Sequence, residues 1–319
     1  MKKFFLILFT VFLFAAAGAQ KIAPADLKLL QRREDTLKAL AKNLIVKEES
    51  GDRMRSDSLF VRTLVRGLQV KHSFYYPFDS VKGISRLYAP DSSFRLFTWS
   101  VALDELYNRQ RGAIQYKTPD GSLKLVALRD FSEFTAAPLD SLRSKDNWIG
   151  AVYYNIIKTQ YNGKNYYTLF GIDNYSVRST RKWIDVLTFD SRNLPVFGGT
   201  FSFEQDTTRK PTKARHYIEY SKEASTTVNY DPELNMILFD HLISESNEPD
   251  KPHTFVPDGD YEGFQWKNGK WVHIEKVFHQ KLEDGQAPVP QPRKQQPFPF
   301  TMEEETQQPP KGSGNKPRK

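Results

Sequence analysis

At Gly83 the spacing of the apolar residues changes from a helical to an alternating pattern, and this change constrains the fold more than any other feature. Downstream of it Val, Ile, Thr, Tyr, Phe and Trp dominate, the residue types that favour β-strands. Asn162-Gly163 and Asn268-Gly269 each separate two alternating stretches, and Asn-Gly suits a type I′ hairpin turn because both turn positions need positive φ. The sequence therefore predicts a mainly β protein, an antiparallel meander of about a dozen strands over residues 71–284.

The sequence pattern does not determine whether this sheet closes on itself. Short antiparallel strands form a large barrel, an open curled sheet, a sandwich or propeller blades. The hairpins are unevenly spaced and no repeated motif marks blades, so we favour a large barrel or an open, curled sheet. One strand is expected to run from residue 196 to residue 203, and residues 139–143 suggest a short helical interruption of the meander.

The segment before Gly83 predicts a pair of helices. Between Pro24 and Val46 apolar residues recur at intervals of three, four and seven, with charged residues between them, and a second helical stretch follows Ser56. Leucines 30, 37 and 44 form a heptad row, which is too short to favour a coiled coil over packing on the chain's own body. We therefore expect the helical segment, residues 20–70, to pack on the β domain, with helix-mediated pairing as the alternative.

Residues 1–19 predict a secretory signal peptide. A positive start at Lys2 and Lys3 is followed by an apolar run and by the small-residue cleavage site Ala17-Gly18-Ala19. The run is shorter than the roughly 20 residues that a membrane-spanning helix needs, and no later stretch reaches that length. The chain has no cysteine, which fits a Gram-negative periplasm better than a eukaryotic secretory route. We expect an exported, periplasmic or extracellular protein with no transmembrane segment after signal cleavage.

Residues 285–319 predict a disordered, proline-rich basic tail. They hold eight of the 19 prolines and six Lys or Arg against three Glu, with too few apolar residues to offset the entropy of ordering. The signal and the tail together carry five of the eight net positive charges, so the folded part retains about +3. This charge is ordinary for a soluble domain and argues against nucleic-acid binding. We expect the tail to contact an envelope protein or polymer.

Three carboxylates alternate in a glycine-containing stretch, at Asp258, Asp260 and Glu262. Oxygen ligands at this spacing are typical of a calcium loop, but the full calcium-loop pattern with its terminal Glu is missing. A turn before the last hairpin accounts for the same residues, because Asp and Gly favour turns. The histidines lack zinc-site spacing and there is no Cys to complete such a site. We keep the three carboxylates as candidate metal ligands, favour the turn, and expect no cofactor.

The chain contains neither a G-x-S-x-G nucleophile motif nor a G-x-x-x-x-G-K phosphate loop. A pair of catalytic carboxylates, as glycosidases use, stays open because Asp185, Glu204, Glu219 and Asp240 lie on or near predicted strands. The distance between two such carboxyl groups decides whether they form a site, and the sequence pattern does not contain that distance.

Two groups of residues are candidates for ligand contact. Trp266 and Trp271 face each other across the last predicted turn; we favour a cross-strand pair that stabilises the hairpin, with a ligand platform as the alternative. Arg178, Arg181 and Lys182 form the densest basic spot in the folded part, in a predicted loop between strands. Such a group of charges is usually just exposed to solvent. The alternative interpretation is that these residues bind an anionic polymer.

The segments SFYYPFDSVKGISRLYAPDSSFRLFTW and FVPDGDYEGFQWKNGKWV resemble an uncharacterised family of exported Gram-negative bacterial proteins, over about residues 55–278. The resemblance implies an exported single domain. The family has no assigned activity, so the resemblance implies no site residue.

Together these features predict an exported, non-catalytic binding or scaffolding protein of the bacterial cell envelope. One alternative is a carboxylate-dependent hydrolase that acts on glycan or peptide. The other is a glycan-binding module that uses exposed aromatic side chains.

Overall fold

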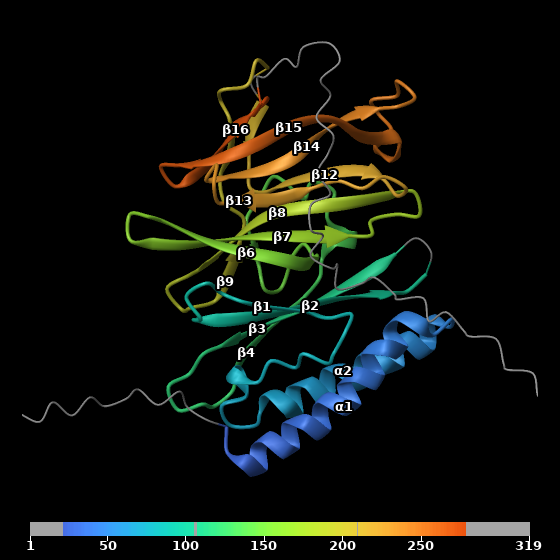
Figure 1. Ribbon diagram of the computed structural model, residues 1–319, viewed down its shortest axis with the longest axis vertical. Coiled ribbons are helices and arrows are strands. Elements are labelled where there is room, and N and C mark those ends of the chain that lie inside the picture. The colour runs from blue at the N-terminus through green and yellow to red at the C-terminus, as the bar shows by residue number, and fades with distance from the viewer. Residues whose placement is uncertain (1–21, 105–106, 209, 279–319) are drawn as a thin grey trace, which may run out of the picture. The chain divides into compact units, whose positions relative to one another are not determined.

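A computed structural model of the protein describes residues 22–104, 107–208 and 210–278 (Figure 1). The predicted signal peptide (1–19) and the predicted tail (285–319) lie outside the described residues. The chain divides into two units, Met1–His279 and Gln280–Lys319, and the description that follows concerns the first. Its described residues form two α-helices, then sixteen strands in three sheets, which confirms the predicted mainly β class with an N-terminal helical pair.

The elements are named by their order in the chain. The helices are α1 (Pro24–Val46) and α2 (Ser50–Leu68), with short 3₁₀ helices η1 (Ser73–Tyr75), η2 (Ser132–Phe134) and η3 (Pro252–Thr254). The helix-side sheet has the order β1 (Ser85–Tyr88), β2 (Phe94–Ala102), β3 (Asn108–Tyr116), β4 (Lys124–Leu128). The middle sheet has the order β5 (Arg143–Ser144), β9 (Pro195–Phe197), β8 (Ser179–Phe189), β7 (Lys164–Asp173), β6 (Val152–Tyr161), and β12 (His216–Ser221) also pairs with β8. The outer sheet has the order β11 (Lys210–Lys213), β10 (Phe201–Phe203), β16 (Lys270–Ile274), β15 (Phe255–Lys267), β14 (Met236–Ser244), β13 (Val228–Asp231).

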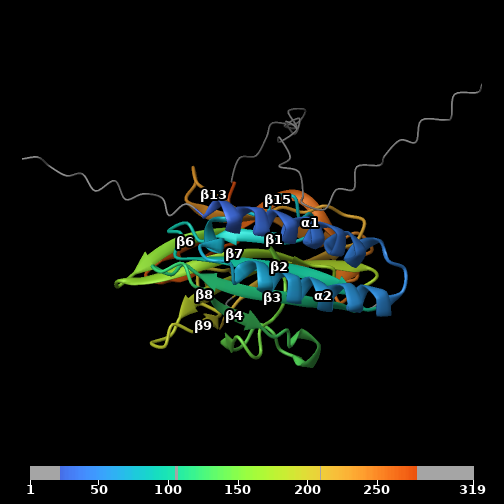
Figure 2. The ribbon, with the colours of Figure 1, turned by 90° about the horizontal axis from the view of Figure 1, so that it is seen from below.

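Three apolar cores separate these layers. The two helices cover one face of the helix-side sheet, as Figure 2 shows from below, and bury Leu37 and Leu64 against Trp99 of β2. The opposite face of the helix-side sheet packs against the middle sheet around Trp148. The middle and outer sheets enclose a third core around Trp271. The order of layers is therefore helices, helix-side sheet, middle sheet and outer sheet.

The middle sheet buries both of its faces, because alternate residues of a strand point to opposite sides. In β8, Trp183 and Leu187 belong to the core shared with the helix-side sheet. Ile184 and Val186 belong to the core shared with the outer sheet. This strand is nearly continuous in apolar residues for that reason.

Both Asn-Gly hairpins are present as the sequence predicts. Asn162 and Gly163 have φ of 47° and 73°, and Asn268 and Gly269 have φ of 50° and 80°. All four values are positive, as a type I′ turn requires.

The connections depart from a simple meander at two places. The strand predicted over residues 196–203 ends at Gly198, whose φ of 112° redirects the chain, and β10 then joins the outer sheet parallel to β16. Strand β12 returns to the middle sheet and pairs with β8 before the chain completes the outer sheet. Short strands such as β5 and β9 bring the number of described strands above the predicted dozen. The predicted helical interruption at residues 139–143 is wrong: a turn leads there into β5, because β5 pairs with β9.

The heptad row of α1 faces the interior of this unit. Leu30 and Leu37 are fully buried and Leu44 is nearly so, in the core that α1 shares with α2 and the helix-side sheet. The packing predicted for this row is therefore the one observed. Neither α1 nor α2, the two α-helices of the described part, combines the length and apolar character that crossing a membrane requires.

Candidate functional site

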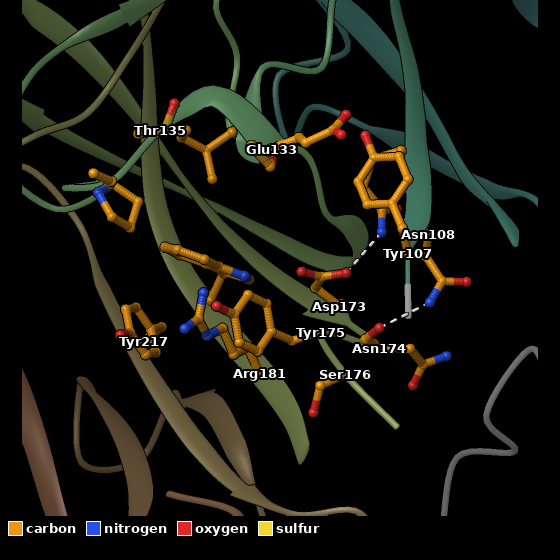
Figure 3. A pocket seen from close by; sticks show the side chains of 16 residues that line it. Tyr107, Asn108, Glu133, Thr135, Asp173, Asn174, Tyr175, Ser176, Arg181 and Tyr217 are labelled. Carbon is orange, nitrogen blue, oxygen red and sulfur yellow. Dashed lines mark hydrogen bonds between the residues drawn. The ribbon is translucent and has the colours of Figure 1, made fainter. Parts of the chain in front are cut away.

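A cavity of about 460 Å³ lies where β3 of the helix-side sheet meets the ends of β7, β8 and β12 of the middle sheet; we call it the Asp173 cavity. Its volume falls within the roughly 300–1,000 Å³ that is typical of small-molecule sites. Figure 3 shows Tyr107, Glu133 and Tyr175 around the carboxyl group of Asp173. The lining combines aromatic rings with amides, hydroxyls and carboxyls, and it comes from segments that are far apart in sequence.

Asp130 organises one wall of this cavity. Its Oδ2 accepts a 2.9 Å hydrogen bond from the backbone N–H of Gln110, and its Oδ1 accepts bonds from Ser132 at 3.0 Å and 2.6 Å. The backbone N–H of Gly150 donates to the same Oδ1 at 3.2 Å. These bonds hold β3, η2 and the segment before β6 together, so the lining is fixed before any ligand arrives.

Asp173 is the last residue of β7 and lines the cavity, and the pKa of its carboxyl group is strongly shifted. Burial, and after it the nearby Asp130 carboxylate, raise the pKa of Asp173 to about 7, although Arg181 and a hydrogen bond from Gln110 act in the opposite direction. The Gln110 amide donates that bond over 2.8 Å, drawn as a dashed line in Figure 3. Near neutral pH this carboxyl group is therefore partly protonated and can both donate and accept hydrogen bonds.

Aromatic rings hold Arg181 on the opposite wall. Its guanidinium carbon lies 3.2 Å from the ring centre of Tyr175 and 4.5 Å from that of Tyr217. The Trp183 and Tyr217 ring centres are 4.7 Å apart. Arg181 also forms a 2.7 Å ion pair with Glu219. The cation is thus neutralised and held flat, and the wall presents ring faces rather than an uncompensated charge.

Two buried polar atoms of the lining residues have no hydrogen-bond partner among the described residues: the indole Nε1–H of Trp183 and the Oε1 of Gln110. Trp183 is 3% exposed and Gln110 is 2% exposed. Buried hydrogen-bonding atoms in native proteins are nearly always paired, because leaving one unpaired costs about 1–3 kcal/mol. The residues that line the cavity thus include one unpaired donor and one unpaired acceptor.

The structure does not bring the three candidate metal ligands together. Asp258, Asp260 and Glu262 lie in β15, where Gly259 bulges out with φ of 94°, and not in the predicted turn before the hairpin. Within the described residues no group of three or more His, Cys, Asp or Glu side chains is placed to hold a metal ion. Each carboxylate lies 2.8 Å from a different basic side chain: Asp258 from His241, Asp260 from Lys276, and Glu262 from His273.

The four carboxylates considered for hydrolysis are also separate, and none of them is among the described residues that line the Asp173 cavity. Each is occupied by its own partner: Asp185 by Arg215 at 3.2 Å, Glu204 by Lys270 at 2.9 Å, Glu219 by Arg181 at 2.7 Å, and Asp240 by the backbone N–H of Thr227.

Trp266 and Trp271 are register partners in the last hairpin, and their ring centres lie 5.2 Å apart in an edge-to-face arrangement. Trp271 is fully buried and its indole donates to Thr168 over 3.1 Å. Trp266 is half-buried and also packs on Tyr166. The structure thus places them as the favoured cross-strand pair.

The basic spot divides between two faces, because Arg181 and Lys182 are neighbours in β8 rather than residues of a loop. Arg181 lines the Asp173 cavity. Lys182 is buried on the other side, where its Nζ donates to the carbonyl of Thr226. Arg178 is exposed just before the strand. Of the three, Arg181 is the one in the cavity.

Sequence reasoning missed most of this cavity, including Asp173, Glu133, Trp183 and Tyr217. One signal was present: the predicted strand over residues 166–172 is followed at once by the polar and aromatic group Asp173-Asn174-Tyr175. Binding residues often lie at the ends of strands. The contributions of β3 and β12 required knowledge of how the sheets stack.

Comparisons of the chain with protein-family models, with curated proteins and with solved structures find no match.

Proposed function

We propose that the protein is an exported binding protein of the cell envelope that holds a small neutral sugar in the Asp173 cavity. The observation that carries the proposal is the pair of unpartnered atoms, Trp183 Nε1 and Gln110 Oε1, on residues that line a preformed cavity. A sugar hydroxyl can accept from the first and donate to the second, because a hydroxyl group does both.

The electrostatics of the lining favour a neutral ligand. Arg181, the described cation of the lining, is already paired with Glu219 and stacked on Tyr175. The Asp173 carboxyl is partly protonated near neutral pH, so it bonds hydroxyls without requiring a cation. An anionic ligand would meet Glu133 and Asp173 with no uncompensated positive charge to offset them.

The lining also suits the shape of a sugar ring. A pyranose has apolar C–H faces and a polar rim, and the cavity is lined by the aromatic side chains of Tyr175 and Tyr217 and by the amides of Asn108 and Asn174. Asn108 already donates to the backbone carbonyl of Asn174 over 2.8 Å, which fixes its side chain. Aromatic side chains and amides together are the combination that orients a polar ring compound.

Calorimetric titration with a panel of neutral monosaccharides and disaccharides tests the proposal. At least one sugar should bind saturably, and Tyr175→Ala should weaken it about tenfold by removing a stacking face. Tyr161→Ala is the matched control, since Tyr161 is a similarly exposed tyrosine at the end of β6 and does not line the cavity. Absence of binding across the panel, or equal affinity in the Tyr175→Ala variant, would overturn the proposal.

A glycan hydrolase is the second candidate, and the raised pKa of Asp173 is the observation that favours it. A carboxylic acid protonated near neutral pH can serve as general acid for a leaving sugar oxygen. Glu133 is a second carboxylate of the same lining and would act as base or nucleophile. Release of reducing sugar from oligosaccharides, lost in Asp173→Asn while sugar binding remains, would establish this activity in place of simple binding.

A further inference from the structure

A second hollow, of about 370 Å³, lies near the opposite end of β7 from Asp173; we call it the lysine pocket. It shares no lining residue with the Asp173 cavity. Its lining residues come from both the helix-side and the middle sheets.

Three of the lining residues are lysines from separate segments. Lys117 follows β3, Lys124 begins β4 and Lys164 begins β7. None of the three forms an ion pair within the described residues. Lys124 Nζ lies 4.9 Å from the ring centre of Tyr116, which is itself part of the lining. Lys117 Nζ lies 5.7 Å from the ring centre of Tyr75 and Lys164 Nζ 5.2 Å from that of Tyr166, two rings outside the lining. Three unpaired lysines in the lining of one hollow favour an anion there.

Two acidic residues near the pocket, Asp91 and Asp190, are already paired with other cations. Asp91, beside the lining residue Ser93, lies 2.9 Å from Lys158. Its carboxylate also accepts bonds from Ser93 and Tyr167. Asp190 pairs with Arg192 at 3.3 Å beyond β8. These two carboxylates are therefore neutralised by Lys158 and Arg192 and not by the lysines of the lining.

The floor of the pocket is aromatic and its rim is polar. Phe94, Tyr167 and Phe189 pack edge to face with ring centres 4.9 to 6.0 Å apart. Asn165 and Ser93 add amide and hydroxyl groups to the lining. A simple inorganic anion would use only the lysines. A ring that carries both hydroxyls and a negative group would use the floor, the rim and the charge together.

We propose that the lysine pocket binds an acidic sugar, a ring with a carboxylate or phosphate substituent, at a site independent of the Asp173 cavity. Lys117, Lys124 and Lys164 bind the anionic group, and the ring lies against Phe189 and Tyr116. The two sites then differ in the charge that they select, neutral at one end of β7 and negative at the other.

Calorimetric titration of the whole protein with glucuronic acid, glucose 6-phosphate, glucose and inorganic phosphate tests this proposal. Both acidic sugars should bind, and the triple variant Lys117→Gln/Lys124→Gln/Lys164→Gln should weaken them about tenfold or more. Added salt should weaken them too, because the lysines are exposed. Lys28→Gln/Lys38→Gln/Lys42→Gln is the matched control, with the same loss of charge from exposed positions on α1.

Several results would overturn the proposal. These are the absence of binding by both acidic sugars, an equal loss of affinity in the two triple variants, or phosphate binding as tightly as glucose 6-phosphate, which would mean that the ring is not recognised. If the triple variant proves less stable than its control, the three single Lys→Gln variants replace it, each expected to weaken binding about threefold. Tyr175→Ala should leave acidic-sugar binding unchanged, which separates this site from the Asp173 cavity.

Discussion

The side-chain amide of Gln110 donates a 2.8 Å hydrogen bond to Oδ1 of Asp173 and so joins β3 of the helix-side sheet to the end of β7 in the middle sheet. The same glutamine is tied through its backbone N–H to Asp130, whose charge helps raise the pKa of Asp173. One residue thus fixes the wall of the cavity and positions its acid, while its own Oε1 has no partner among the described residues.

Asp173→Asn should make stability less dependent on pH. In the unfolded chain the carboxyl ionises near its ordinary value of 3.8, and in the folded protein its pKa is about 7. Between these values the folded state binds more protons, so stability falls as pH rises. From about pH 4 to about pH 7 the wild type should therefore lose about 2 kcal/mol relative to the variant, by urea denaturation. If the free energies of unfolding of the two proteins changed in parallel with pH, that result would contradict the raised pKa of Asp173.

Arg215→Met should be strongly destabilising. Arg215 lies 3.2 Å from Asp185 in the interior, and the two side chains are 0% and 2% exposed. Removing the cation leaves a buried carboxylate alone, at a cost of about 3–5 kcal/mol in the free energy of unfolding. The double variant Arg215→Met/Asp185→Asn should recover part of that loss. A loss below about 1 kcal/mol for the single variant, measured by urea denaturation, would mean that this pair is not the buried ion pair described.

His216→Phe should protect the protein against acid. Burial, with the nearby His273 and Lys210 as further causes, lowers the pKa of His216 to about 3. Below pH 6.5, the ordinary pKa of histidine, His216 is protonated in the unfolded chain but stays neutral in the folded protein. The free energy of unfolding therefore decreases as pH falls. The ring already packs against Phe239 and Phe264.

Between about pH 7 and about pH 5 the His216→Phe variant should lose about 1 kcal/mol less stability than the wild type. His273 titrates in the opposite sense: burial lowers its pKa, but Glu262 and Asp206 outweigh burial and raise it. The quantity to measure is therefore the difference in the free energy of unfolding between the His216→Phe variant and the wild type. Both proteins contain His273, so its contribution cancels in this difference. Equal acid sensitivity would argue against a buried, neutral His216.

Gly269→Ala should cost more stability than Gly163→Ala. Both glycines occupy positive-φ positions of Asn-Gly turns, so each substitution pays about 1 kcal/mol for a left-handed alanine. A Cβ at Gly269 would in addition lie 2.5 Å from the ring of Tyr161, whereas one at Gly163 would meet nothing within 4 Å. Thermal unfolding of the two variants compares them directly, and equal midpoints would contradict the contact.

Local patterns in the sequence predict the individual strands and turns, but they do not predict how the sheets stack. The β-favouring residues at 183–189 predict a strand, and the Asn-Gly pairs predict their turns, because both depend on neighbouring residues alone. The departure of β10 into the outer sheet depends on Gly198 and on a parallel partner, β16, that lies far along the chain. No local pattern carries that pairing.

The candidate site shows the same division. Asp173 and Tyr175 are neighbours in sequence, but Gln110 and Tyr217 join them only because β3 and β12 pack at the same end of the middle sheet. Charged residues singled out from the sequence, such as Asp185 and Lys182, are instead buried with partners of their own. Successive side chains of a strand point to opposite faces of the sheet. Which face borders a cavity depends on the layers that pack on each side of the sheet.

The indole Nε1–H of Trp183, which has no partner among the described residues, is the group that a sugar in the Asp173 cavity must contact. Nitrogen–proton correlation NMR resolves the Nε1–H groups of the five tryptophans, and Trp183→Phe assigns the relevant signal. Titration with the tightest-binding neutral sugar should shift the Trp183 signal saturably. Trp148 and Trp271, whose indoles already donate to Tyr153 and Thr168, serve as internal controls and should not move. A Trp183 signal that stays fixed while sugar is bound would contradict the assignment of the Asp173 cavity as the binding site.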